Sequence, residues 1–336
     1  MLRVQFEEAR DRVAELFEAE NLDEDDAALL AEIMTTHSLA GVPSHGLHFV
    51  RLILSGLRAG RIDPQAKAEC VSRFGAWEQW DGHQAPGPLS ALRATDRSLE
   101  LAREMGVGVV AMRNTNHWTR PGYFGHRAAH AGFGLLCWAN TPAVMPAWGG
   151  SEPKLGNNPI VFAIPNGETP VVLDMALSQF SIGRLHTLRA AGETLPVPGG
   201  YDENGELSDD PAAILDSRRS LPIGYWKGAG LALLLDLLGA TLAGGNTTLD
   251  RTREAPHDSV CQIFIAFDLA HRLGADPIAD TVWRVVADLR ESVADDAFRF
   301  PGEGVARRTA ENRKAGVPVD ARVWAKIVAA SDALRS

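Results

Sequence analysis

A histidine that could exchange a proton lies in the segment Gly41-Val42-Pro43-Ser44-His45-Gly46. Glycine, proline and serine interrupt the chain there, between runs with a helical pattern at 24–39 and 47–57, and place His45 at the mouth of a helix. Histidine has an unperturbed pKa of about 6.5, so it can exchange protons at neutral pH. His45 is therefore a candidate general acid or base, and an exposed loop histidine is the alternative that this segment leaves open.

A denser cluster of polar side chains covers residues 114–123, directly after a predicted strand at 107–113. Folds of the α/β class usually place their site residues at the ends of strands. There Asn116 and His117 would point from the strand end, and Arg120 could bind a carboxylate through two hydrogen bonds. A hydrogen-bonded turn without a ligand is the alternative interpretation of this cluster.

His126 and His130 are four residues apart on a predicted helix, a spacing that could chelate a metal ion. The glutamate that follows the first histidine in zinc peptidases is missing here. A helix face that carries two histidines is therefore the better account, and we expect no metal site. A metal-dependent hydrolase that uses this pair remains the candidate from a different class of function.

The sequence contains no usable Rossmann fingerprint. Residues 106–111, Gly-Val-Gly-Val-Val-Ala, match the string, but the motif requires a strand before the glycines and a helix after them. The predicted order here is the reverse. Gly228-Ala229-Gly230 opens a predicted helix whose N-terminus could bind phosphate, but the third glycine is missing. Loops rich in Asn, Gly and Pro at 138–150 and 155–159 offer backbone amides to a ligand instead.

Hydrophobic periodicity predicts which elements would position these side chains. The helices that we expect are at 6–20, 24–39, 47–57, 86–105, 123–131, 179–190, 227–243, 278–291 and 320–334. The strands that we expect are at 69–74, 76–81, 107–113, 135–139, 159–164, 170–175 and 260–267. This order predicts an α/β fold with a helical N-terminal unit at 1–66, on which 305–336 packs back, and a central α/β domain at 67–304. We expect the apolar section Leu231–Leu238 to be fully buried.

Composition limits the class of protein. The 336 residues are 45% hydrophobic and 23% charged, so the chain can bury a large core. A net charge of -10 argues against a nucleic-acid partner, which needs clustered Lys and Arg. The three cysteines, Cys70, Cys137 and Cys261, form no CxxC and indicate a reducing compartment. The N-terminus lacks the apolar core of a signal peptide, and we see no apolar run of the roughly 18 residues that a membrane span needs. We expect a cytoplasmic protein with a small-molecule substrate.

Seven segments occur in an order and at a spacing that are typical of one family. They are GVPSHG, NTNHW, ANTPAVMPAWGG, LGNNP, VVLDMA, LPIGYWKGAG and RFPGEG. In these segments, over essentially its whole length, the chain resembles the malate/L-lactate (L-sulfolactate) dehydrogenase family of NAD(P)-dependent oxidoreductases. Stretches such as EQWDG, FSIG and LPVPGGYDENG are most similar to members that act on 2,3-diketo-L-gulonate. The resemblance implies a non-Rossmann mixed β-sheet that binds the dinucleotide, a helical domain formed from both chain ends, and a homodimer.

The resemblance also implies roles for individual residues. His45 would donate or accept the proton at the substrate oxygen, and His117 would line the same pocket. Ser44 and Arg120 would contact the substrate, with Arg120 on its carboxylate. The residues that match the family's cofactor-binding positions are Pro170, Val171, Val172, Leu173, Asp174, Met175, Ala176, Trp226, Lys227, Gly302, Glu303 and Gly304.

Two positions depart from the family's pattern. Many members carry an arginine where a gapped alignment places His48, which leaves Arg51 as the nearest guanidinium. His48 or Arg51 would then have to take part in binding the substrate carboxylate. Asn157 stands where the family usually has threonine, which is a small exchange between polar side chains.

The activity implied by the resemblance is the reduction, with NADH, of the C2 ketone of a 2-oxo sugar acid, 2,3-diketo-L-gulonate to 3-keto-L-gulonate. NADPH is the alternative cofactor. The same chemistry on malate, lactate, ureidoglycolate, sulfolactate or a cyclic imine carboxylate is the alternative activity. A binding protein without catalysis is disfavoured because both motif histidines, His45 and His117, are present.

Overall fold

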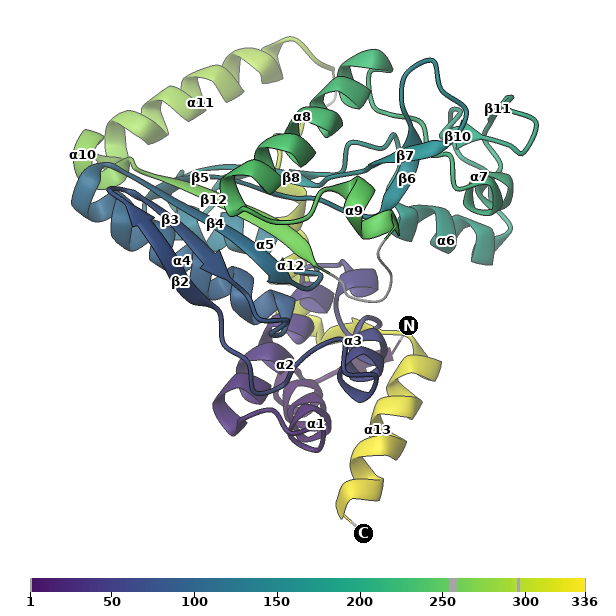
Figure 1. Cartoon of the computed structure of the whole chain (residues 1–336). Coiled ribbons are helices and arrows are strands. Elements are labelled where there is room, and N and C mark those ends of the chain that lie inside the picture. Colours follow the sequence, from purple (N-terminus) through teal and green to yellow (C-terminus); the bar gives the residue numbers. More distant parts are fainter. Residues whose placement is uncertain (1, 254–258, 295–296, 336) are drawn as a thin grey trace.

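A mixed β-sheet forms the centre of the computed structural model, which describes residues 2–253, 259–294 and 297–335 (Figure 1). Within these residues its strand order is β2-β3-β4-β12-β5-β8-β9, with β3 and β4 parallel and the other neighbours antiparallel. The strands are β2 (Glu69–Phe74), β3 (Trp77–Asp81), β4 (Val107–Thr115), β5 (Phe133–Ala139), β8 (Ile160–Ile164), β9 (Val171–Met175) and β12 (Val260–Asp268). The expected α/β fold with a mixed sheet is confirmed.

Helices cover both faces of this sheet (Figure 1). On β4, Val110 packs with the buried residues of α4 (Gly87–Met105) and α5 (Gly122–His130), whereas Ala111 packs with those of α8 (Trp226–Ala243). This alternation follows from the two-residue period of a strand. Gly108 lies where α4 crosses β4, and a Cβ there would overlap the carbonyl oxygen of Ser98. The second glycine of the false fingerprint therefore permits helix–strand packing.

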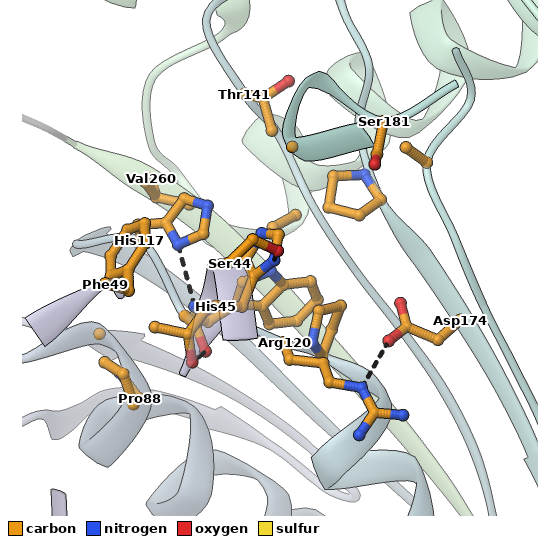
Figure 2. A pocket seen from close by; sticks show the side chains of 18 of the residues that line it. Ser44, His45, Phe49, Pro88, His117, Arg120, Thr141, Asp174, Ser181 and Val260 are labelled. Atoms are coloured by element: carbon orange, nitrogen blue, oxygen red, sulfur yellow. Dashed lines mark hydrogen bonds and ion pairs between the residues drawn. The ribbon is translucent and has the colours of Figure 1, made fainter. Parts of the chain in front are cut away.

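The two ends of the chain lie side by side. Strand β1 (Leu2–Val4) pairs with β13 (Val317–Val319), and α1 (Phe6–Glu18) packs against α13 (Ala321–Arg335). Buried side chains of α1, α2 (Glu24–Leu39) and α13 belong to the same core cluster as those of α4 and β4. The chain ends thus form one helical layer against the sheet, and the cleft of Figure 2 lies between them. The domain boundaries at 66 and 304 stay a prediction.

The other elements complete the molecule around this frame. The third predicted helix begins later than expected: residues Pro43–His45 form a 3₁₀ turn, η1, residues 46–49 form further turns, and α3 spans Val50–Arg58. The remaining elements are β6 (Ala143–Pro146), β7 (Pro153–Gly156), α6 (Ile182–Ala191), β10 (Gly200–Tyr201), β11 (Leu207–Ser208), α7 (Pro211–Ser217), α9 (Thr248–Arg253), α10 (Ala270–Leu273), α11 (Ala275–Glu291) and α12 (Glu303–Ala315).

Helix α8 does not fit our expectation. Its section Leu231–Leu238 is not fully buried: Leu234 is 63% exposed, and four further leucines of the section are 39–48% exposed. The helix turns its small residues, Leu235 and Asp236 toward the sheet, and the indole of Trp138 donates a hydrogen bond to the carbonyl of Leu235 at 3.0 Å. A helix that is apolar all round gives no sign of which face it buries.

By length and composition, α8 is also the one helix of the described ranges that is apolar enough to cross a membrane. Its carboxylate Asp236 is buried and accepts hydrogen bonds from the backbone of Thr248 and the side chain of Asn140. These contacts tie the helix to the loop after β5 and to α9.

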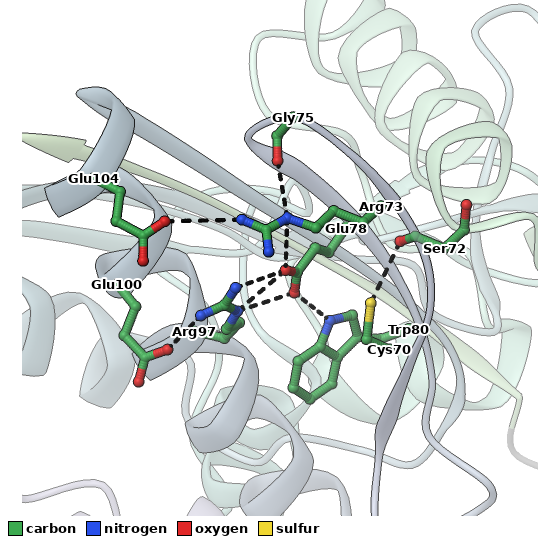
Figure 3. Close-up of polar contacts among 9 residues, drawn as sticks. All are labelled: Cys70, Ser72, Arg73, Gly75, Glu78, Trp80, Arg97, Glu100 and Glu104. Atoms are coloured by element: carbon green, nitrogen blue, oxygen red, sulfur yellow. Dashed lines mark hydrogen bonds and ion pairs between the residues drawn. The ribbon is translucent and has the colours of Figure 1, made fainter.

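A buried carboxylate joins β3 to α4 (Figure 3). Glu78 on β3 is 3% exposed; it accepts hydrogen bonds from the Arg97 guanidinium at 2.8 Å and from the Trp80 indole at 3.0 Å. Arg73 lies 3.6 Å away, and Arg97 also pairs with Glu100 on its own helix. The Arg97 hydrogen bonds hold the pKa of Glu78 below its usual value.

Replacement of Glu78 by glutamine is expected to lower the free energy of unfolding by about 2–3 kcal/mol, because the guanidinium of Arg97 loses its buried charge partner. Urea unfolding at pH 7 measures this difference. Because the native pKa of Glu78 is depressed, the difference should disappear as the pH falls through that native pKa. The exposed Glu104 is the control, and Glu104→Gln should change stability by less than about 0.5 kcal/mol. Equal effects of the two variants would contradict this role of Glu78.

Candidate active site

A cavity of about 790 Å³ opens between the N-terminal helices and one edge of the sheet. It is lined by side chains of η1 and α3, by the loop after β4, by β9 and by the start of α6. The expected site residues that line it are Ser44, His45, His117, Arg120, Val172, Leu173, Asp174, Met175, Ala176 and Gly302. Residues from four distant parts of the chain thus meet in one cleft (Figure 2).

His45 lies at the end of η1, a turn closed by the hydrogen bond from the Gly46 amide to the carbonyl of Pro43 at 3.0 Å. Gly46 is required there, because a Cβ would overlap the Ser38 side chain and the backbone of α2. The hydroxyl of Ser44 lies 3.1 Å from Nδ1 of His45. Nε2 is therefore the nitrogen of His45 that is left for a ligand.

A second histidine holds the backbone of the first. His37, fully buried on α2, donates a hydrogen bond from Nδ1 to the carbonyl of His45 at 2.9 Å. The hydroxyl of Thr119 lies 3.3 Å from the same nitrogen. Burial lowers the pKa of His37 to about 3, so its imidazole is neutral. The hydrogen bond from His37 thus ties the backbone of His45 to α2.

The rings of His45 and His117 stack, with centroids 5.7 Å apart and planes at 19°. Phe49 adds a third ring, 4.9 Å from His117 and 6.1 Å from His45. The backbone amide of Thr119 donates to Nδ1 of His117 at 2.9 Å, and Thr119 adopts a positive φ of 66° to do so. A non-glycine residue held in this region often marks a functional site. The strained turn thus fixes the orientation of His117.

The cleft keeps His45 neutral when no substrate is bound. Burial, and after it the positive charge of Arg120, lower the pKa of His45 to about 4. His117 also lines the cleft, and burial lowers its pKa to about 3. At neutral pH, His45 in the free protein is therefore a proton acceptor. An anion bound beside it would raise the pKa and make it a donor.

Arg120 and Asp174 form an ion pair across the cleft, with 3.7 Å between Nε and Oδ2 (Figure 2). The backbone amide of Gly122 also donates to Asp174 at 2.9 Å. Burial lowers the pKa of Arg120 and raises that of Asp174, and each is offset by the charge of the other. The resemblance implied that Arg120 binds the substrate and that Asp174 binds the cofactor. In the structure the two side chains contact each other.

The predicted cofactor segments lie next to each other. The amide of Val172 on β9 donates to the carbonyl of Pro301 at 2.9 Å. Gly302 has a φ of 97°, and a Cβ there would lie 3.0 Å from the backbone of Pro170 and of Val172. Glycine at 302 therefore allows this close approach.

Some expected residues do not reach the cleft. Pro170, Val171, Glu303 and Gly304 lie next to lining residues but are not on the wall, and Glu303 pairs with Arg290 at 2.9 Å. Trp226 and Lys227 lie at the start of α8, also off the wall, where Trp226 is 62% exposed. The side chains of His48 and Arg51 line a second cavity, between α1, α3 and α13.

Sequence reasoning missed three features of the wall. Phe49 stands four residues after His45, a spacing that could have indicated a shared face. Arg61 lines the cleft from the loop after α3. The start of α6 lies opposite Ser44, and a Cβ on Gly183 would be 3.3 Å from the hydroxyl of Ser44. Only the folded chain brings α6 to this position.

His126 and His130 stack on α5, with centroids 6.2 Å apart. Burial lowers the pKa of His126 to about 4. In the part of the chain that the structure describes, no three His, Cys, Asp or Glu side chains are grouped so that they could hold a metal ion. The geometry gives no support to a hydrolase built on this pair.

Comparisons with known proteins show the family to which the chain belongs. Residues 4–328 match the family model described as malate/L-lactate dehydrogenase. The chain is 40% identical to a 2,3-diketo-L-gulonate reductase of Salmonella typhimurium over 333 residues, which are 98% of this chain and all of the relative. A putative malate/lactate dehydrogenase from E. coli superimposes with a TM-score of 0.90 at 26% identity, over 99% of this chain and 95% of that one. The sulfolactate dehydrogenase of Methanocaldococcus jannaschii gives a TM-score of 0.85 at 25% identity, over 97% and 95%. The chain is therefore an oxidoreductase that belongs to the malate/L-lactate dehydrogenase family.

Proposed function

We propose that the protein reduces the C2 ketone of a 2-oxo acid with NADH, and that this substrate is 2,3-diketo-L-gulonate, giving 3-keto-L-gulonate. The observation that carries the proposal is the stacked pair of His45 and His117 beside Arg120 in one cleft. The named relatives of the chain support the substrate. The bound nicotinamide cofactor supplies the hydride.

His45 moves the proton at the C2 oxygen. Its Nδ1 is held by Ser44, so Nε2 faces the reacting oxygen, and a positioned general acid of this kind accelerates a reaction by about 10²–10⁴-fold. The carboxylate of the substrate raises the pKa of His45 when it enters the cleft, because a neighbouring negative charge favours the imidazolium. The substrate thus brings both the oxygen that accepts the proton and the negative charge that keeps His45 protonated to donate it.

Arg120 binds that carboxylate and fixes which face of the ketone is presented. Asp174 approaches Nε of Arg120, and the two terminal nitrogens of the guanidinium remain for a planar, two-point contact with the substrate. This contact holds the reacting carbon in place, which is the orientation part of catalysis. His48 and Arg51, which line the second cavity, take no part in this arrangement.

The residues of the cleft wall fit a dinucleotide without a Rossmann fingerprint. The β9 residues Val172–Ala176 border the cleft as an extended backbone, and Gly302, which also lines the cleft, can pack directly against that strand because it has no side chain. Backbone groups of β9 would hold the cofactor, with Trp226 and Lys227 at the periphery of the site. We infer NADH rather than NADPH from the resemblance to the 2,3-diketo-L-gulonate subfamily.

A panel assay tests this activity. The purified protein is given 2,3-diketo-L-gulonate, pyruvate, oxaloacetate, sulfopyruvate and a cyclic imine carboxylate, each with NADH and with NADPH. We expect kcat/KM to be at least about tenfold higher for 2,3-diketo-L-gulonate with NADH than for any other combination, a difference of about 1.4 kcal/mol in transition-state binding. A higher kcat/KM for another acid would make that acid the substrate in place of 2,3-diketo-L-gulonate. If neither NADH nor NADPH were oxidised with any of these acids, the proposal of a reductase would be wrong.

We further propose a cytoplasmic homodimer whose subunits meet on α8. The helix exposes leucines along the side turned away from the sheet, and an apolar surface of this kind usually marks an interface between proteins. Replacement of Leu234 and Leu238 by aspartate should give a folded monomer in sedimentation velocity. The control is Leu334→Asp on α13, where a 51% exposed leucine lies far from α8. A dimer that survives the double substitution would place the interface elsewhere.

A further inference from the structure

A second cavity, of about 600 Å³, lies between α1, α3 and α13. Figure 1 shows these helices at the bottom of the molecule and α8 at the top. The aliphatic side chains that line the cavity are Leu16, Leu47, Val50, Leu54, Val323 and Ile327. Three cationic side chains, Arg51, Arg58 and Lys326, also line it, and none of the described lining residues is acidic.

Helix α3 and the turn before it separate this cavity from the catalytic cleft. On one side, Ser44, His45, Phe49 and Ile53 line the cleft. On the other, Leu47, His48, Arg51, Leu54 and Arg58 line the second cavity. Residues three and four apart share a face of a helix, so the two sets point to opposite sides. The second cavity is therefore separate from the catalytic cleft.

The positive charge of the second cavity is only partly compensated. Arg58 pairs with Glu20 at 2.6 Å. The exposed side chains of Arg51 and Lys326 have no ion pair or hydrogen bond with any of the described residues. Nε2 of His48 is buried and also lacks a hydrogen-bond partner within the described ranges. The cavity thus combines an aliphatic wall with positive charge at its mouth.

We propose that this cavity binds an aliphatic carboxylate, in chemical terms a medium-chain fatty acid. Its chain lies among the leucines, where apolar surface is removed from water, and its carboxylate lies toward Arg51 and Lys326. The volume is in the range of small-molecule sites, roughly 300–1,000 Å³. The exposed leucines of α8, at the other end of the molecule, provide the surface for a second copy. This site is independent of the proposed reduction.

Calorimetric titration of the full-length protein with sodium octanoate, nonanoate and decanoate tests the site. We expect one molecule per chain and about fourfold tighter binding for each added methylene, the gain from burying one CH₂. Nonyltrimethylammonium, which has the same nine-carbon chain but a positive head, should bind at least about tenfold more weakly than decanoate, since it meets the same cations.

Two variants locate the bound carboxylate. Arg51→Gln with Lys326→Gln should weaken decanoate binding by at least about tenfold, because the charged hydrogen-bond donors are lost. The control, Arg307→Gln with Lys314→Gln, removes the same charge from exposed positions on α12 and should leave binding unchanged. Ala330→Trp places a large ring in the cavity from an exposed position and should abolish binding while circular dichroism remains that of the wild type.

The opposite results would overturn the proposal. Decanoate affinity that is equal in the wild type, the double variant and Ala330→Trp would place the fatty acid elsewhere. Several molecules bound per chain without saturation would indicate adsorption on exposed leucines. A change of sedimentation coefficient in Ala330→Trp would assign the cavity to a contact between subunits.

Discussion

Replacement of His45 by alanine is expected to lower kcat for reduction by about 10²–10⁴-fold, while the dissociation constant for NADH stays within about twofold of the wild-type value. The side chain lies at the end of η1 with Nε2 available to a ligand, and it is the general acid of the proposed reaction. The proposed cofactor wall, β9 and Gly302, lies on other elements, so the loss should appear in turnover rather than in cofactor binding. Steady-state kinetics gives the first quantity and quenching of tryptophan fluorescence by NADH gives the second.

The matched control is His130→Ala. His130 is exposed on α5 and does not line the cleft, so its loss should leave kcat unchanged. The same variant tests the hydrolase alternative, because a metal site on His126 and His130 would lose its ion. Near-wild-type turnover in His45→Ala would remove His45 from the mechanism. If His130→Ala kept its fold but lost activity, the histidine pair His126 and His130 on α5 would be implicated instead.

The pH dependence of kcat/KM is the second large effect that we expect. For reduction, kcat/KM should fall about tenfold for each pH unit, hence about 100-fold between pH 5.5 and 7.5. The value kcat/KM reports groups of the free enzyme, and there burial and the charge of Arg120 lower the pKa of His45 to about 4. Donation requires the imidazolium, whose fraction falls tenfold per unit above that pKa. Initial rates at low substrate concentration in constant-ionic-strength buffers give the profile.

Two comparisons make this prediction specific to His45. The decline in kcat should begin at a higher pH than the decline in kcat/KM, because the bound carboxylate raises the pKa of the imidazole. In the direction of oxidation the neutral imidazole is the acceptor, so kcat/KM should stay level over the same range. A level profile for reduction from pH 5.5 to 7.5 would show that another group donates the proton.

The sequence determined the local elements and the position of the first candidate residue. Strand β2 covers residues 69–74 as expected, and the glycine that follows it, Gly75, is a local signal for the end of a strand. The wrong order of helix and strand was enough to reject the false fingerprint, and Gly108 serves to pack α4 on β4. The interruption of helical structure before His45 could also be predicted, since Gly, Pro and Ser favour turns by their own local conformational preferences.

The tertiary structure alone decided which side chains share the cleft. Phe49 enters it, whereas His48 and Arg51 point to the other side of α3. Arg120 meets Asp174 because β9 and the loop after β4 come together across the sheet, an order that strand patterns do not encode.

The tertiary structure also decided which face of helix α8 is buried. Its apolar residues lie on every side, so a 3.6-residue period could not select the face that contacts the sheet. Packing selected the small residues, with Leu235, because they allow the backbone to approach Trp138 and β12. Hydrophobic periodicity predicts the buried face of an element only where polar residues lie on one side and apolar residues on the other. Where all sides are apolar, the surface that the element packs against determines which face is buried.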